Sequence, residues 1–83
     1  MQDYTEITGM VLKVEPMGEY DKRVVILTKE KGKISAFARG ARKQGSRLLA
    51  ATSPFSFGEF KIYAGRNSYS IMEASISNYF EGL

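Results

Sequence analysis

The chain has 83 residues, 43% of them hydrophobic, and twelve lysines and arginines against nine acids give a formal net charge of +3 at pH 7. This length predicts one domain with a small core, and apolar residues spread along the chain argue against disorder. The absence of cysteine and histidine excludes disulfides and ordinary zinc or copper sites, and the acids show no paired or metal-like spacing. We therefore expect neither an enzyme nor a bound cofactor.

Turn signals rich in glycine and proline recur along the chain and separate β-branched and aromatic runs, which predicts a small all-β barrel or sandwich. The first strand is predicted at about residues 4–15, with apolar residues on both faces and Gly9 placed for a kink or bulge. The second is predicted at residues 23–29 and is apolar throughout its centre. A polar turn with Gly32 then predicts a hairpin to the third strand.

The third predicted strand, residues 33–39, alternates cleanly between two faces. One face carries Ile34, Ala36 and Ala38, and the other carries Lys33, Ser35, Phe37 and Arg39. The first face is expected in the core. The second would present an aromatic ring between cations, an arrangement that binds single strands by stacking bases and tracking phosphates. The alternative is that Phe37 lies under a loop in a second small core, since most phenylalanines are buried.

A short helix is predicted at residues 46–52, where Ser46 can cap the N-terminus and a Ser-Pro pair ends the helix. A fourth strand is predicted at residues 55–64, and its apolar pattern changes parity at Gly58, which indicates a bulge there. A fifth strand follows at residues 69–77. Four aromatic residues of this part of the chain are expected in the core rather than at a base-stacking surface: Phe60, Tyr63, Tyr69 and Tyr79.

The predicted order of elements is three strands, a short helix and two more strands. This is the order of the OB-fold, a five-stranded barrel with a helix between strands 3 and 4. We expect this all-β barrel to occupy residues 1–78 and residues 79–83 to begin a linker or a following element. The usual ligand surface of the fold is the face of strands 2 and 3, bounded by the first and last hairpin loops. Those loops are expected here at about residues 16–21 and 65–68.

The charge is unevenly distributed along the sequence. Residues 22–47 hold nine of the twelve cations and a single acid, Glu30, for a net charge of +8, whereas the remaining residues net −5. If the fold keeps this segment on one face, it forms a basic patch that attracts polyanions. The alternative is a merely solvated charged surface. The residues predicted to contact DNA are Arg39, Arg42, Lys43, Arg47, Lys33, Phe37, Lys22, Arg23 and Arg66; Arg66 could clamp a strand or be idle.

Residues 18–48 resemble the N-terminal domain of the bacterial RecO family of DNA repair and recombination proteins, and the similarity extends over about residues 4–83. The ordered set of matching features carries the resemblance: Gly18-Glu19-x-Asp21, Thr28, Gly32-Lys33, Arg39-Gly40-Ala41-Arg42-Lys43, Ser46-Arg47 and Pro54-Phe55. Gly40 and Gly45 within it are expected to supply positive φ angles or close backbone approach.

This resemblance implies an OB-fold that binds single- and double-stranded DNA, with Arg39, Arg42, Lys43 and Arg47 in the contacting region. It also implies strand annealing, loading of recombinase onto strands coated by single-strand-binding protein, and RecR as a partner. Members of the family continue into a larger helical domain that often carries a zinc site. We expect this chain to be an excised domain or a natural fragment, and partner binding to depend on the missing domain.

The charge pattern and the resemblance together favour two alternative functions. The first is a DNA-binding module of limited sequence preference. The second is a protein-interaction module whose basic face takes an acidic peptide, such as the tail of a single-strand-binding protein. The N-terminal residues lack a signal-peptide pattern and no apolar run is long enough to span a membrane, so a cytoplasmic, nucleoid-associated protein is expected.

Overall fold

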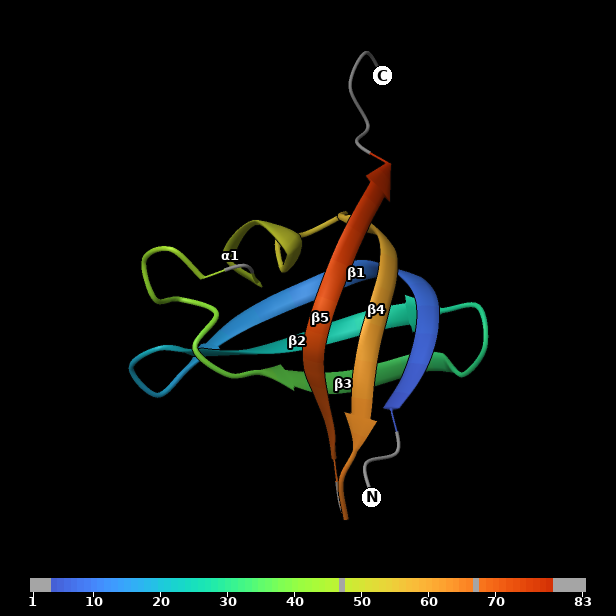
Figure 1. The fold of residues 1–83 in the computed structure, drawn as a ribbon, viewed down its shortest axis with the longest axis horizontal. Helices are drawn as coiled ribbons and strands as arrows, with labels where there is room; N and C mark the ends of the chain where they lie inside the picture. Colours follow the sequence, from blue (N-terminus) through green and yellow to red (C-terminus); the bar gives the residue numbers. More distant parts are fainter. Residues whose placement is uncertain (1–3, 47, 67, 79–83) are drawn as a thin grey trace.

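The computed structural model describes residues 4–46, 48–66 and 68–78. Over these residues the chain forms the elements β1 (Tyr4–Met17), β2 (Asp21–Thr28), β3 (Gly32–Ala38), α1 (Leu48–Ala51), β4 (Phe57–Ala64) and β5 (Tyr69–Asn78) (Figure 1). The predicted fold class, strand order and position of the helix are confirmed. In the part of the chain that the structure describes, no helix has the length and apolar character needed to cross a membrane.

The strands close into a barrel in the order β1-β2-β3-β5-β4, which is the order of an OB-fold. Among the pairings of the described strands, only β3–β5 is parallel. The long strand β1 closes the barrel because its first half pairs with β4 and its second half pairs with β2 (Figure 1). Gly9 lies where β1 pairs with both β2 and β4, and a Cβ there would lie 2.5 Å from the carbonyl oxygen of Leu27. The bulge expected at Gly9 falls instead between Val11 and Lys13.

The core fills the barrel with alternating side chains from all five strands. Its largest fully buried members are Phe60, Ile7, Ile26, Ile62, Val11, Val24 and Thr52. Each large aliphatic or aromatic side chain buried in this way contributes roughly 1.5–3 kcal/mol relative to its exposed state. On β3, Ala36 and Ala38 are fully buried, as their alternation predicts. The side chains on the opposite face of β3 therefore point away from the core, where they can contact a ligand.

Helix α1 is a single turn at the end of the barrel, and it is shorter than the predicted 46–52. The Ser46 Oγ accepts a hydrogen bond from the Leu48 N–H at 3.1 Å, so the expected cap is present. After the helix, β4 begins at Phe57 rather than at the expected Phe55. Phe55 has a φ of 69° and donates its N–H to the Val11 oxygen at 2.7 Å, which places it in a turn against β1. The expected bulge beside Gly58 is confirmed.

Candidate nucleic-acid interface

The segment that follows β3 is tied to the turn between β1 and β2. The Asp21 carboxylate accepts the Gly40 N–H at 2.7 Å, and the Arg42 N–H donates to the Tyr20 carbonyl at 2.8 Å. The Arg42 guanidinium also donates to the Gly18 carbonyl at 3.2 Å. Figure 1 shows the two segments side by side at the left of the barrel. These contacts hold residues 39–43, here called the basic loop, in a defined position.

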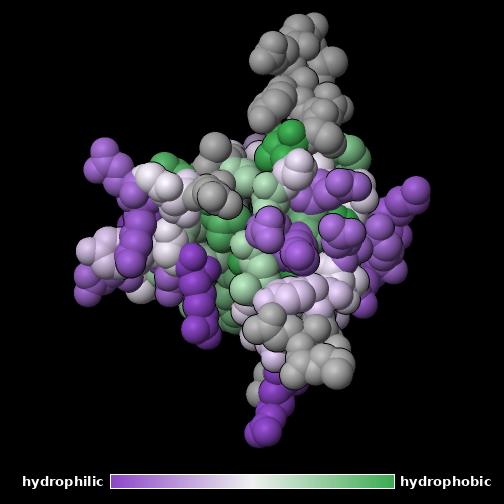
Figure 2. Space-filling view, viewed as in Figure 1, coloured by the Kyte–Doolittle hydropathy of each residue, from purple (hydrophilic) through white to green (hydrophobic). Residues whose placement is uncertain are grey.

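The basic loop presents its charges to solvent. Arg39, Arg42 and Lys43 are all exposed, and the Lys43 ammonium lies 5.4 Å from the ring centroid of Tyr20. Gly40 has a φ of 69°, a conformation that most side chains avoid, and Gly45 is also at positive φ, as expected. Figure 2 shows hydrophilic side chains gathered on the side where the basic loop and the β1–β2 turn lie. Fixed, exposed cations of this kind attract phosphates at low entropic cost.

A groove of about 530 Å³ lies beside the basic loop, between the outer face of β2 and β3 and the β4–β5 turn. It is lined by Met17, Arg23, Ser35, Phe37, Ala64, Gly65, Arg66, Ser68 and Tyr69. Three of the residues predicted to contact DNA, Arg23, Phe37 and Arg66, meet here. Phe37 is half-buried, so its ring is neither in the core nor fully exposed. The groove thus combines aromatic rings with flanking cations.

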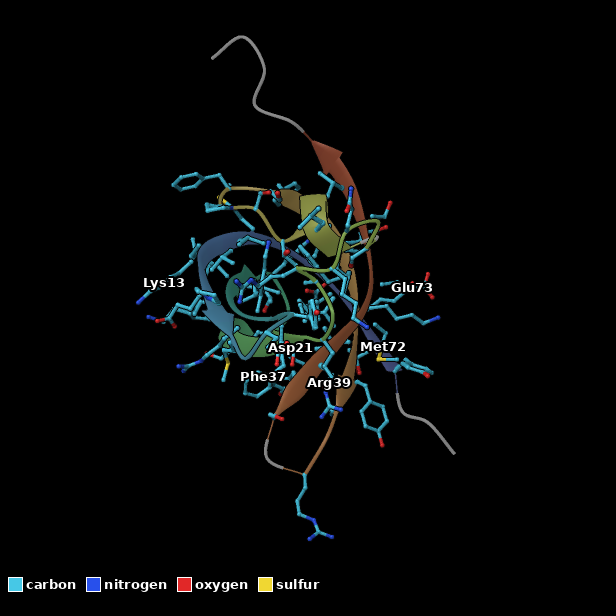
Figure 3. The ribbon with its side chains drawn as sticks, turned by 90° about the vertical axis from the view of Figure 1, so that its left-hand side faces the viewer. Lys13, Asp21, Phe37, Arg39, Met72 and Glu73 are labelled. Carbon is cyan, nitrogen blue, oxygen red and sulfur yellow. The ribbon has the colours of Figure 1, made fainter. Side chains whose placement is uncertain are left out.

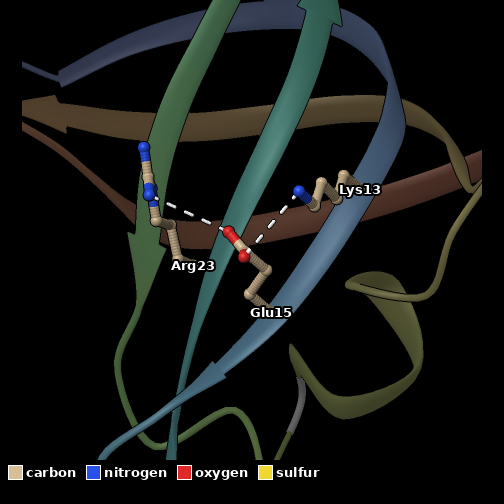
Figure 4. Close-up of polar contacts among 3 residues, drawn as sticks. All are labelled: Lys13, Glu15 and Arg23. Atoms are coloured by element: carbon tan, nitrogen blue, oxygen red, sulfur yellow. Dashed lines mark ion pairs between the residues drawn. The ribbon is translucent and has the colours of Figure 1, made fainter.

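Arg23 lies directly across from Phe37 in the β2–β3 pairing. Its guanidinium is 3.8 Å from the Glu15 carboxylate, which also lies 3.8 Å from the Lys13 ammonium (Figure 4). The side chains of Arg23 and Glu15 are 48% and 43% exposed, and exposed pairs of this kind contribute only about 0–1 kcal/mol. Arg23 can therefore exchange Glu15 for a phosphate at small cost.

Lys22 is placed differently from the other predicted residues. Its ammonium donates to the Thr52 hydroxyl at 3.1 Å and to the Leu49 carbonyl at 3.5 Å. Burial, and secondarily the nearby charge of Arg42, lower the pKa of Lys22. Lys22 thus joins β2 to the α1 segment.

The remaining predicted residues are spread over the molecule. Lys33 is exposed on the outward face near the start of β3, and Arg66 is exposed on the β4–β5 turn at the groove. Arg47 lies outside the described residues. Of the nine predicted residues, the structure gathers six around the basic loop and the groove: Arg23, Phe37, Arg39, Arg42, Lys43 and Arg66.

Two contributors to this face were not predicted. Asp21 positions the basic loop through Gly40, although its place in the Gly18-Glu19-x-Asp21 pattern was the only signal for it. Tyr69, expected in the core, lines the groove at the start of β5, and the Lys31 ammonium lies 5.9 Å from its ring centroid. Within residues 4–46, 48–66 and 68–78, no three acids gather closely enough to hold a metal ion.

Comparison with known proteins gives a consistent match. A family described as "Recombination protein O N terminal" matches residues 1–80. The chain is 40% identical over 75 residues to DNA repair protein RecO of Clostridium novyi, covering 90% of this chain and 29% of that protein. It is 41% identical over 75 residues to the protein of the same name from Alkaliphilus metalliredigens, covering 90% and 30%. A third, from Bacillus velezensis, is 50% identical over 56 residues, covering 68% and 22%. The chain thus spans less than a third of the length of these relatives.

Proposed function

The chain belongs to the Recombination protein O N-terminal family, and from that premise we propose that it is the DNA-binding domain of a recombination mediator. It contacts single- and double-stranded DNA mainly through phosphates, in DNA repair and strand annealing. The observation that carries the proposal is that the basic loop is fixed to the β1–β2 turn, directly after Met17, which lines the groove. The groove lies on the face of the barrel where an OB-fold usually binds its ligand.

The contacts of the basic loop suit it to hold a phosphate. Arg42 uses one N–H to reach the Gly18 carbonyl, and a guanidinium has five such donors, so others remain for phosphate oxygens. Lys43, held against the ring of Tyr20, adds a second charge at the same place. Because the backbone of the loop is already fixed by Asp21 and Tyr20, binding does not have to order it.

The groove supplies the second kind of contact. Arg23 and Arg66 flank Phe37 and Tyr69, so a phosphate can meet a cation while an unpaired base stacks on a ring. Contacts of this kind carry little sequence information, because every base has an aromatic face. The domain is therefore expected to bind DNA with limited sequence preference.

An acidic peptide is the alternative occupant of the same cations, and RecR and single-strand-binding protein are the partners that the family resemblance implies. DNA is favoured here because the cations stand beside aromatic rings, which offer stacking surfaces for bases. A peptide with the acidic tail of a single-strand-binding protein would compete with DNA at the basic loop if it shared the site.

The test is fluorescence anisotropy of labelled single-stranded DNA at roughly 50 and 200 mM salt. Two variants are compared, Lys43→Ala in the basic loop and Lys29→Ala in the β2–β3 turn. Each removes one lysine, so the formal net charge falls equally in both, from +3 to +2. Loss of one phosphate contact would reduce the salt slope by about 0.7, so the affinity ratio between the native chain and Lys43→Ala would change about 2.6-fold between the two salt concentrations.

The proposal predicts that DNA binding by the native chain weakens with salt. The slope of affinity against salt should be smaller in the basic-loop variant and unchanged in the control. Equal losses in the two variants would mean that net charge rather than the basic loop attracts DNA. If the native chain binds the acidic peptide but does not bind DNA, the proposed ligand of the basic loop is the peptide and not DNA.

A further inference from the structure

The strand pairing places one outward-facing residue from each strand in a continuous row around the barrel. From β2 to β1, the row consists of Arg23, Phe37, Ser70, Tyr63 and Tyr4. One neighbour along the strand is a buried core residue for Arg23, Phe37, Ser70 and Tyr63, namely Val24, Ala36, Ile71 and Ile62, so alternation turns these four side chains to the outer surface. Tyr4 is itself 37% exposed. Tyr63 is 37% exposed, and its ring meets that of Tyr4 edge to face at 6.0 Å between centroids.

A second hollow, of about 340 Å³, lies at the far end of this row. It is lined by Tyr4, Arg39, Tyr63, Ser70 and Met72. Arg39 belongs to the basic loop but turns toward this hollow, and Figure 3 shows it between Phe37 and Met72. Aromatic side chains and a cation therefore recur beyond the groove, on the other side of the β3–β5 pairing.

The neighbouring row of outward-facing residues has the opposite charge balance. It contains Glu6, Lys61 and Glu73, which lie opposite one another on β1, β4 and β5. The Lys61 ammonium is 3.9 Å from the Glu73 carboxylate and 5.1 Å from the ring centroid of Tyr4. Two carboxylates against one ammonium repel phosphates, so this row sets a boundary for a bound strand.

We propose that a DNA single strand held in the groove continues across the β3–β5 pairing, where Arg39 contacts a phosphate and Tyr63 stacks an unpaired base. This inference rests on the proposed function and extends its site. The path from Arg23 to Tyr63 crosses three inter-strand spacings of about 4.8 Å, or about 14 Å, which is within the footprint of an OB-fold on a single strand. Bases reach these rings only when unpaired, so the extension favours single strands over duplex.

The first test is photocrosslinking of the native chain to an oligothymidylate carrying 5-iodouracil, followed by trypsin digestion and mass spectrometry. Trypsin releases residues 34–39, whose one aromatic residue is Phe37, and residues 62–66, whose one aromatic residue is Tyr63. A crosslink in each peptide is the expected result. A crosslink in residues 34–39 without one in residues 62–66 would overturn the extension and leave DNA binding in the groove intact. A chain that binds no DNA in anisotropy would overturn both proposals.

The second test separates stacking from charge. Tyr63→Ala is expected to lower affinity for a twelve-nucleotide oligothymidylate by about fivefold or more, and to leave affinity for an abasic strand of the same length unchanged. Tyr63→Phe keeps the ring and should bind both strands as the native chain does. Phe55→Ala is the matched control, because Phe55 is 63% exposed but lies in the turn before β4. If Tyr63→Ala lowered the affinity for the oligothymidylate and for the abasic strand equally, or lowered neither, the inference would be contradicted.

Discussion

Asp21 offers a way to separate the position of the basic loop from its charge. Its carboxylate accepts the Gly40 N–H at 2.7 Å, and this bond joins the β1–β2 turn to the basic loop. Removing one acid raises the formal net charge from +3 to +4 in either Asp21→Ala or Asp21→Asn. Only Asp21→Asn keeps an oxygen that can accept the Gly40 N–H. The two variants therefore differ in the hydrogen bond and match in charge.

The magnitudes follow from the contact. A hydrogen bond to a charged acceptor contributes about 1.5–3 kcal/mol, and each kcal/mol shifts the melting temperature of a domain this size by about 4–8 °C. Asp21→Ala is thus expected to melt at least about 6 °C below the native chain, with Asp21→Asn between the two. Ordering one released residue costs about 1–2 kcal/mol, so Asp21→Ala should bind single-stranded DNA about fivefold more weakly than Asp21→Asn.

Thermal unfolding followed by circular dichroism and DNA anisotropy measure the two quantities. A simple charge effect would have the opposite sign, because both variants are more positive and would bind DNA more tightly. Equal melting temperatures and equal, increased DNA affinities in the two variants would refute the positioning role of Asp21.

Four further variants test the barrel and its contacts. Gly9→Ala should destabilise the fold by about 2 kcal/mol or more, seen in urea unfolding, because its Cβ would lie 2.5 Å from the Leu27 carbonyl oxygen. Phe55→Gly should raise stability by about 0.5–1 kcal/mol, because it relieves a φ of 69° at an exposed side chain; a loss of stability would contradict this. Arg42→Ala should raise the pKa of Lys22, measured by NMR, because Arg42 is the second cause of its lowering after burial. Because the pKa of Lys22 in the folded chain lies below its ordinary value of 10.5, the unfolded chain binds more protons at pH values between the two pKa values. The free energy of unfolding of the native chain should therefore rise with pH in this range, relative to that of Lys22→Met.

The fold was largely predictable because local patterns and long-range pairing agree. The alternation on β3 identified its buried alanines, and the change of parity at Gly58 identified a bulge. Phe55 was placed wrongly because an aromatic residue after a Ser-Pro pair looks like the start of a strand. Its backbone instead bonds Val11 of β1, a contact between distant residues that no local pattern encodes.

The composition of the candidate site followed from the sequence more than its geometry did. Clustered charge proposed Arg39, Arg42 and Lys43 as DNA contacts, yet it could not show that Arg39 turns away from the other two. Charge alone also could not distinguish Lys22, whose ammonium is engaged by Thr52 of a segment thirty residues away. Tyr63 was expected in the core but is 37% exposed. Its exposure depends on which face of β4 the barrel turns outward, and local sequence does not show this.

The proposed DNA-binding face can be located by an NMR titration of the isotopically labelled chain with a single-stranded oligonucleotide. We expect the amides of Phe37, of residues 39–43, of Arg66 and of Tyr69 to shift together as DNA is added, and the shifts to recede with salt. Shifts confined to the acidic row of Glu6, Lys61 and Glu73, or to the turn around Phe55, would contradict the proposed site.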